Sequence, residues 1–95
     1  MDALDLEKTK PIFEKSGVTY AALFGSYARG EQKSTSDVDI LIRVNPPFSL
    51  FDLIGLEREL GDILGKKIDL VTESAISKYI KDEVISESKT IYEKA

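Results

Sequence analysis

Apolar and polar residues follow two alternating patterns along this chain, and these patterns predict strands and helices in alternation. Short apolar runs bounded by glycine or polar residues are typical of buried strands. Three such runs occur, at 20–24, 37–42 and 67–71. Elsewhere apolar residues recur every three or four positions, as on one side of a helix. This spacing predicts helices at 11–17, 49–65 and 74–87, with a short helix at 27–29 and a short last strand at 90–92.

The longest predicted helix carries its own start and stop signals. Ser49 and Asp52 have the spacing of a capping box, in which each side chain accepts a hydrogen bond from the other residue's N–H, and Gly65 is a typical terminator. The apolar stripe between them is expected to face a core: Leu53, Leu56, Leu60, Ile63 and Leu64. The whole pattern predicts one α/β (α+β) domain over residues 1–95, a small mixed β-sheet with helices packed on one face.

Composition limits the functions open to such a domain. The 95 residues are 42% apolar, enough for one small core, and their formal net charge of −4 disfavours non-specific attraction to nucleic acids. We therefore expect no direct nucleic-acid partner. The sequence contains no cysteine and no histidine, so acid–base chemistry falls to carboxylates. It shows no signal peptide and no apolar run of bilayer length, which predicts a cytoplasmic protein without a membrane partner.

The segment after the first predicted strand has the features of an anion-binding turn. Gly25 lets the backbone approach a ligand, and free N–H groups at the start of the next helix point toward a bound anion. Ser26 adds a hydroxyl donor, and Arg29 and Lys33 add positive charge that suits phosphate oxygens. A glycine–serine turn is also a common loop, so this segment alone is weak evidence. Tyr27 has two interpretations: it stacks on a base, or it packs against the sheet.

Two carboxylates follow in the next predicted strand. Side chains alternate between the faces of a strand, so Asp37 and Asp39 project to the same side. Two charges that close repel by roughly 4 kcal/mol at an effective dielectric of about 20, and a cation between them relieves this. Ligand sets of oxygen alone favour magnesium or manganese. The alternative is that Asp37 is a turn residue and Asp39 an exposed charge at the strand end.

A third carboxylate, Asp69, lies in the middle of the run at 67–71. An isolated charge in a buried strand is costly. If this strand lies beside the first two aspartates, Asp69 completes a cluster that binds a second metal ion and accepts the proton of an attacking hydroxyl. The alternative is that Asp69 lies at a sheet edge and faces water. Its combination with the other two aspartates favours the functional interpretation.

These segments together resemble a known motif. The stretches Gly25-Ser26-Tyr27-Ala28-Arg29-Gly30 and Ser36-Asp37-Val38-Asp39-Ile40 are similar to the defining motif of the DNA polymerase beta nucleotidyltransferase superfamily. More narrowly, the chain resembles the minimal nucleotidyltransferase (MNT) family, the antitoxin component of HEPN/MNT toxin–antitoxin pairs, from about Val18 to Tyr92. Family members typically have leucine at the position of Ile40, which is a conservative departure.

The resemblance implies a fold, a reaction and a partner. It implies the minimal nucleotidyltransferase fold, with the triphosphate of ATP on Gly25 and Ser26, and magnesium on Asp37, Asp39 and Asp69. Two magnesium ions are expected, with manganese as the alternative. The implied enzyme is a protein adenylyltransferase that moves AMP from ATP to a hydroxyl and releases diphosphate. The implied acceptor is a tyrosine of a HEPN-domain toxin.

Two other functions stay open from the sequence. A non-catalytic antitoxin would neutralise its toxin by binding alone, although three mutually repelling carboxylates give a pure binder no advantage. A nucleotidyltransferase acting on a small molecule, such as an aminoglycoside, would need an additional substrate domain that residues 1–95 do not include. The sequence leaves the base preference open, and also whether the protein forms a homo-oligomer.

Overall fold

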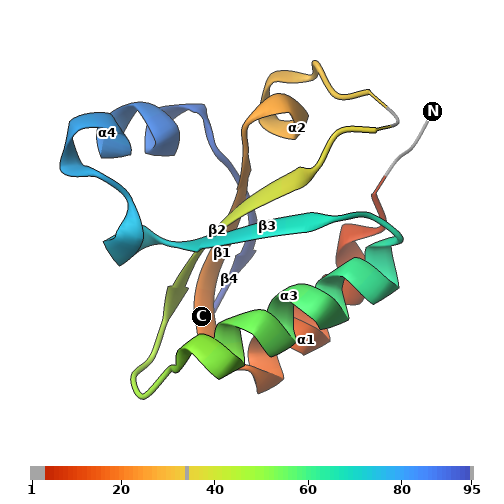
Figure 1. Ribbon diagram of the computed structural model, residues 1–95, viewed down its shortest axis with the longest axis vertical. Coiled ribbons are helices and arrows are strands. Elements are labelled where there is room, and N and C mark those ends of the chain that lie inside the picture. The colour runs from red at the N-terminus through yellow and green to blue at the C-terminus, as the bar shows by residue number, and fades with distance from the viewer. Residues whose placement is uncertain (1–3, 34, 95) are drawn as a thin grey trace.

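A four-stranded sheet with helices packed around it forms the framework of the protein, as the computed structural model shows for residues 4–33 and 35–94 (Figure 1). In chain order the elements are the 3₁₀-helix η1 (Leu6–Thr9), α1 (Lys10–Lys15), β1 (Val18–Phe24), α2 (Ser26–Arg29), β2 (Val38–Val44), α3 (Leu50–Leu64), β3 (Ile68–Thr72), the 3₁₀-helix η2 (Glu73–Ala75), α4 (Lys78–Glu87) and β4 (Lys89–Glu93). The predicted order of helices and strands is confirmed, with η1 and η2 as additions.

The order of strands across the sheet is β3-β2-β1-β4. The central strand β1 pairs antiparallel with both β2 and β4, whereas β2 and β3 pair parallel. Parallel neighbours need a long crossover, and α3 supplies it. This topology places the starts of β2 and β3 and the end of β1 at the same end of the sheet.

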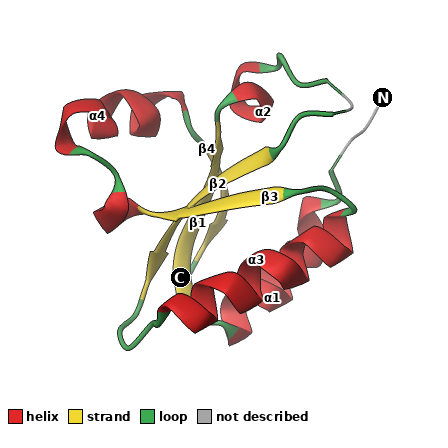
Figure 2. Cartoon of the chain, viewed as in Figure 1, coloured by secondary structure: helices red, strands yellow, loops and turns green. Residues whose placement is uncertain are grey.

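One face of the sheet is covered by α1 and α3, and the hydrophobic core lies between them and the strands (Figure 2). From β2, the alternate side chains Val38, Ile40 and Ile42 are fully buried in this core. Phe13 of α1 and Leu60 of α3 pack against them and are also fully buried. The residues between these β2 positions therefore face the other side of the sheet.

Helix α3 begins and ends where its local sequence predicts. The Ser49 hydroxyl accepts a hydrogen bond from the Asp52 N–H at 3.1 Å, and the Asp52 carboxylate accepts one from the Ser49 N–H at 2.8 Å. Gly65 ends the helix in the left-handed conformation, with φ +66°. The predicted core stripe holds except at Ile63, which is 42% exposed because it lies on the side of α3 that faces away from the sheet.

Helix α4 lies on the other side of the sheet from α1 and α3 (Figure 1). It starts at Lys78, four residues later than predicted, because η2 occupies the preceding segment and the Ser77 hydroxyl caps the new start. None of its residues is buried. The predicted mixed sheet with a helical layer on one face is confirmed by α1 and α3, and α4 stands outside that layer.

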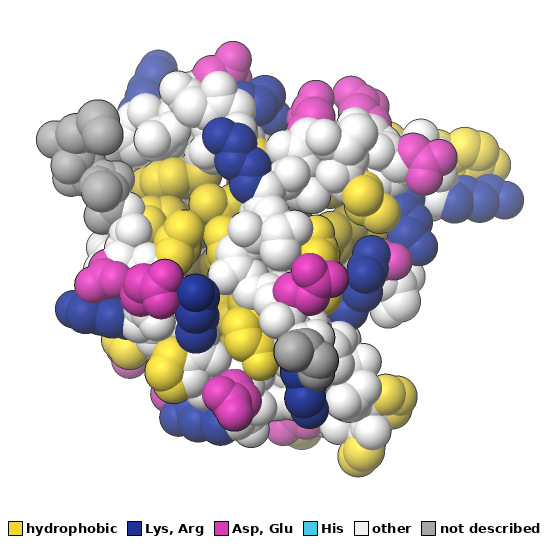
Figure 3. Space-filling model, turned by 180° about the vertical axis from the view of Figure 1, so that it is seen from behind, with side chains coloured by type: hydrophobic (Ala, Val, Ile, Leu, Met, Phe, Trp, Pro, Cys, Tyr) yellow, Lys and Arg dark blue, Asp and Glu magenta, His cyan; other side chains and the backbone are white. Residues whose placement is uncertain are grey.

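The surface mixes both signs of charge. On the side seen in Figure 3, lysine and arginine side chains are interspersed with aspartate and glutamate around exposed apolar groups. None of the helices within residues 4–33 and 35–94 has the length and apolar character needed to cross a membrane.

We expect Leu60→Ala to lower the free energy of unfolding by about 2–5 kcal/mol, because it removes buried side-chain volume between α3 and the sheet. Leu50→Ala is the matched control on the same helix, since Leu50 is 69% exposed, and it should change stability by less than about 0.5 kcal/mol. Urea unfolding followed by circular dichroism measures both variants. Equal losses would contradict the packing of α3 described above.

Candidate active site

The parallel pairing of β2 and β3 brings two of the three predicted aspartates side by side. Asp39 of β2 is the register partner of Asp69 of β3. The pairing begins where the Val38 N–H donates a hydrogen bond to the Lys67 carbonyl at 2.9 Å. Because Val38 faces the core, Asp39 and Asp69 share the opposite face of the sheet.

The predicted glycine turn closes onto this pair from the end of β1. Phe24 is the register partner of Asp39, and Gly25 follows it with φ +70° and ψ −147°, a conformation open essentially to glycine alone. A Cβ atom on Gly25 would lie 2.3 Å from an Asp39 carboxylate oxygen. The turn therefore needs glycine for two reasons, its backbone conformation and the contact with Asp39. Ser26, directly after it, is the first residue of α2.

The Asp39 carboxyl lies in an electrostatically unfavourable position. Burial raises the pKa of Asp39, and the charges of Asp69 and Asp37 and a hydrogen bond with the Asp69 side chain raise it further. The positive charge of Arg29 acts in the opposite direction. The balance is a surplus of negative charge at the end of the sheet, which a cation would neutralise.

The third aspartate, Asp37, points toward a lysine. It lies one residue before β2, and its carboxylate is 3.9 Å from the Lys67 ammonium group. Within the described part of the chain, no three acidic side chains are arranged to hold one metal ion. The structure thus brings Asp39 and Asp69 together and leaves Asp37 beside them in a separate ion pair.

The donor set nevertheless fits magnesium. Asp37, Asp39 and Asp69 offer only carboxylate oxygens, which is the ligand type that Mg²⁺ prefers, and Mg²⁺ usually keeps several waters rather than a full protein cage. The raised pKa of Asp39 marks the surplus charge that a divalent ion would offset. The Asp37–Lys67 pair is exposed, and such pairs are worth about 0–1 kcal/mol, so the Asp37 side chain can turn at little cost.

The two predicted phosphate-binding cations have different surroundings. The Arg29 guanidinium donates to Glu31 at 2.8 Å and lies 3.8 Å from Glu87 at the end of α4, so it is already paired. Lys33 lies in the exposed loop before β2, where its N–H donates to the Ser36 hydroxyl at 2.8 Å. Among the described contacts, none joins Lys33 to the aspartates, and its phosphate contact stays a prediction, as does that of Arg29.

Tyr27 packs in the core. Its side chain is 8% exposed and belongs to the apolar cluster beneath the sheet, which is the second of its two predicted interpretations. Its hydroxyl finds no hydrogen-bond partner among the described residues.

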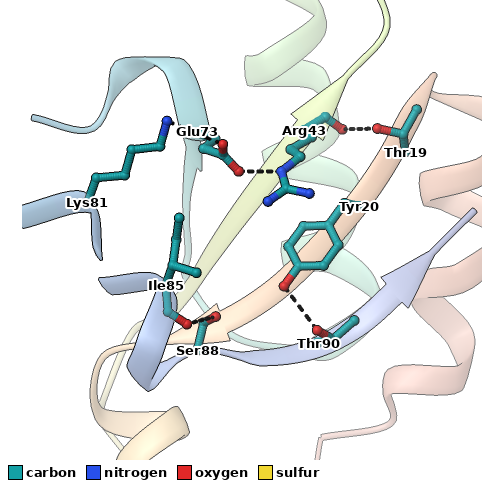
Figure 4. A network of polar contacts seen from close by, with 8 residues as sticks. All are labelled: Thr19, Tyr20, Arg43, Glu73, Lys81, Ile85, Ser88 and Thr90. Atoms are coloured by element: carbon teal, nitrogen blue, oxygen red, sulfur yellow. Dashed lines mark hydrogen bonds and ion pairs between the residues drawn. The ribbon is translucent and has the colours of Figure 1, made fainter. Parts of the chain in front are cut away.

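A polar network further along the same sheet face was not predicted from the sequence (Figure 4). Arg43 of β2 donates a hydrogen bond to Glu73 of η2, and Lys81 of α4 lies 3.4 Å from the Glu73 carboxylate. The hydrogen bond from Arg43 is the main reason that the pKa of Glu73 is lowered. The Arg43 guanidinium also lies over the Tyr20 ring, 4.5 Å from its centre. This network ties η2 and α4 to the sheet, and because it joins residues thirty positions apart it leaves no local sequence signal.

Comparisons with known proteins identify the family of the chain. The sequence pattern of polymerase beta nucleotidyltransferases matches residues 7–95. The chain belongs to this family. Among its relatives in the family, a candidate protein adenylyltransferase of Methanocaldococcus jannaschii is 47% identical over 81 residues, which cover 85% of this chain and 87% of the relative. The protein adenylyltransferase MntA of Thermococcus cleftensis is 42% identical over 78 residues, covering 82% and 79%.

Solved structures show the same nucleotidyltransferase fold. A toxin–antitoxin crystal structure with AMP-PNP has a TM-score of 0.83 at 24% identity and covers 95% of this chain and 74% of that one. A tri-AMPylated HEPN toxin of Shewanella oneidensis in complex with an MNT antitoxin gives a TM-score of 0.74 at 21% identity, covering 98% and 73%. At these identities the likeness establishes the minimal nucleotidyltransferase fold and no more.

We expect Gly25→Ala to be more destabilising than Gly30→Ala. Both glycines have positive φ, +70° and +72°, but a Cβ atom meets Asp39 only at Gly25, since Gly30 has nothing within 4 Å. Gly30→Ala should cost about 1–2 kcal/mol from backbone strain alone. Gly25→Ala should exceed this by at least about 1 kcal/mol, because its backbone region is reserved for glycine and its Cβ displaces Asp39. Urea unfolding of the two variants tests the difference, and equal costs would argue against the Gly25–Asp39 contact.

We expect Asp39→Asn to raise the thermal unfolding midpoint at pH 7 in buffer with EDTA. Folding raises the pKa of the Asp39 carboxyl, so this group binds more protons in the folded state than in the unfolded state. The stability of the fold therefore falls as the pH rises from the unfolded-state pKa of the carboxyl through its raised folded-state pKa. The variant removes this penalty, and we expect a gain of a few degrees, since about 1 kcal/mol shifts the midpoint by about 4–8 °C in a domain of this size.

The gain should shrink below pH about 4, where both states are protonated. Asp62→Asn, at an exposed aspartate of α3, controls for the loss of one negative charge. A variant less stable than wild type at pH 7, or a gain that does not depend on pH, would contradict the electrostatic strain at Asp39.

Proposed function

We propose that this protein is a magnesium-dependent nucleotidyltransferase that moves AMP from ATP to a hydroxyl group, a tyrosine of a HEPN-domain toxin, and so acts as a cytoplasmic antitoxin. The observation that carries the proposal is the arrangement of Gly25, Asp39 and Asp69 at one end of the sheet. Asp39 and Asp69 are register partners, and the Gly25 backbone lies directly against the Asp39 carboxylate. Such a site offers a carboxylate pair next to a turn on which a polyphosphate can lie.

The metal would be held by this chain's carboxylates. Asp39 and Asp69 form the ready pair, and Asp37 joins them by turning away from Lys67. When bound, two Mg²⁺ ions, or Mn²⁺ in their place, would neutralise charge on the triphosphate and the carboxylates. Nucleotidyl transfer needs positioning and charge neutralisation more than covalent help from side chains.

The chain's other contribution is to hold the nucleotide. Gly25 leaves room for phosphate oxygens because it has no side chain, and Ser26 adds a hydroxyl and an N–H at the start of α2. Arg29 supplies positive charge at this end of the sheet, because its charge partly lowers the raised pKa of Asp39. Its guanidinium group lies between Glu31 and Glu87. Lys33 is the second cation assigned to the nucleotide.

Proton transfer falls to Asp69. Its side chain is exposed beside Asp39, so an acceptor can reach it from solvent. Asp69 would accept the proton of the acceptor hydroxyl while the oxygen bonds to the α-phosphorus and the bond to diphosphate breaks. Histidine cannot serve as the base in this step, because the sequence contains none.

The acceptor and partner are inferred from relatives. The relatives in Methanocaldococcus and Thermococcus carry the name protein adenylyltransferase. The similar structures are toxin–antitoxin complexes, one with AMP-PNP and one with an AMPylated HEPN toxin. This support favours a protein hydroxyl over a small-molecule acceptor and ATP as the nucleotide.

The test is intact mass spectrometry of a co-expressed HEPN-type partner incubated with this protein, ATP and Mg²⁺. We expect mass increments of AMP on the partner with wild type. Asp39→Asn should abolish them, and Asp69→Asn should slow transfer by roughly 10²–10⁴-fold, the usual contribution of a general base. Asp62→Asn, at an exposed aspartate of α3 that has no role in the proposed site, should transfer at the wild-type rate.

The location of the added AMP is then read by peptide mass spectrometry, where a tyrosine is expected. A stable complex whose partner keeps its original mass would overturn the enzymatic proposal in favour of neutralisation by binding. Full transfer by Asp39→Asn would overturn the assignment of the site.

A further inference from the structure

Three aspartates and one lysine lie at the start of β2 and β3: Asp39 and Asp69 within the strands, and Asp37 and Lys67 directly before them. Asp39 pairs with Asp69 in the parallel register, and Val38 pairs with Ile68. One step earlier, the same register places Lys67 beside Asp37. The hydrogen bond of 2.9 Å from the Val38 N–H to the Lys67 carbonyl fixes this position through the backbone.

Lys67 is the one cation among these four residues. Its ammonium group is 3.9 Å from the Asp37 carboxylate, and the Lys67 and Asp37 side chains are 80% and 47% exposed. Lys67 directly precedes β3 and Asp37 directly precedes β2, so this contact lies next to the register partners Asp39 and Asp69. Asp37 therefore has a counter-charge in the residue that directly precedes the neighbouring strand.

We infer that Lys67 is a positioning residue that competes with a divalent cation for Asp37. The ammonium group and a metal ion both seek the same carboxylate oxygens and repel each other, so binding of the ion displaces Lys67 into solvent. Because the Asp37–Lys67 pair is exposed, it is weak enough to yield to a divalent ion. Lys67 thereby raises the metal concentration at which all three aspartates engage. This inference rests on the proposed function, because it presumes that the aspartates bind a divalent cation.

The experiment is a titration of the whole protein with Mn²⁺, in which electron paramagnetic resonance reports the free ion. Lys67→Met keeps the length of the side chain and removes its charge. We expect this variant to bind Mn²⁺ roughly two- to five-fold more tightly than wild type at low ionic strength. The gain should shrink at high salt, because an exposed charge is screened. Lys67→Arg should keep the wild-type affinity.

Two controls separate competition from a general change of charge. Lys10→Met also breaks an exposed lysine–glutamate pair, at 3.1 Å to Glu7, and changes the net charge equally, but α1 lies on the opposite face of the sheet. It should leave the Mn²⁺ affinity unchanged. In an Asp37→Asn background, Lys67→Met should lose most of its effect, because the contested carboxylate is gone.

The outcomes distinguish this inference from the proposed function. If wild type binds Mn²⁺ and Lys67→Met binds it equally or more weakly, the competition is overturned and the metal site stands. If neither protein binds Mn²⁺, the proposed metal site and this inference are both overturned. A gain of equal size in Lys10→Met, or an undiminished gain in the Asp37→Asn background, would also overturn the competition.

Discussion

The parallel pairing of β2 with β3 is the constraint on which the rest of the site depends. It exists because α3 carries the chain across the sheet, held by its capping box at one end and by Gly65 at the other. The register of this pairing decides which residues stand beside Asp39 and Asp37. A shift of one residue would turn Asp69 into the core and an apolar neighbour onto the site face. The buried positions of β2 and β3 oppose such a shift, so the packing of the core fixes the geometry of the acidic pair.

Negative charge is concentrated around Asp39, where the apolar core provides no opposite charge. Asp39 is held between the Gly25 backbone and Asp69, and the pKa of its carboxyl is raised by burial and by the neighbouring acids. Two cations lie nearby: the charge of Arg29 lowers the cost at Asp39, and Lys67 pairs with Asp37. Both make exposed ion pairs, which are weak and exchangeable. Such a site retains a surplus of negative charge that a bound cation would neutralise.

The two faces of the sheet have different roles: one packs the core and the other carries the polar side chains. Its inner face is closed by α1 and α3 and holds the apolar core cluster, whereas its outer face carries the aspartates and the Arg43–Glu73–Lys81 network (Figure 4). Helix α4 has no fully buried residue; it is attached through the half-buried Val84 and Ile85, through this network and through the contact of Glu87 with Arg29. Polar, exposed attachments give an element low local stability. Helix α4 is thus held more weakly than the carboxylate pair, whose strands are fixed by the core.

The sequence by itself determined the elements, because helix caps, apolar periodicity and the conformational preferences of glycine act over a few residues. It also selected Gly25, Asp37, Asp39 and Asp69 as candidate site residues from their types and spacings, and their roles stay predictions. Only the tertiary structure decided how the side chains pair: Asp37 with Lys67, Arg29 with Glu31 and Glu87, and Tyr27 with the core. It also decided that α4 leaves the helical layer and that Ile63 is exposed. Such outcomes depend on which distant segments the sheet register brings together, and a charged or aromatic residue can satisfy its needs with several partners until that register is fixed.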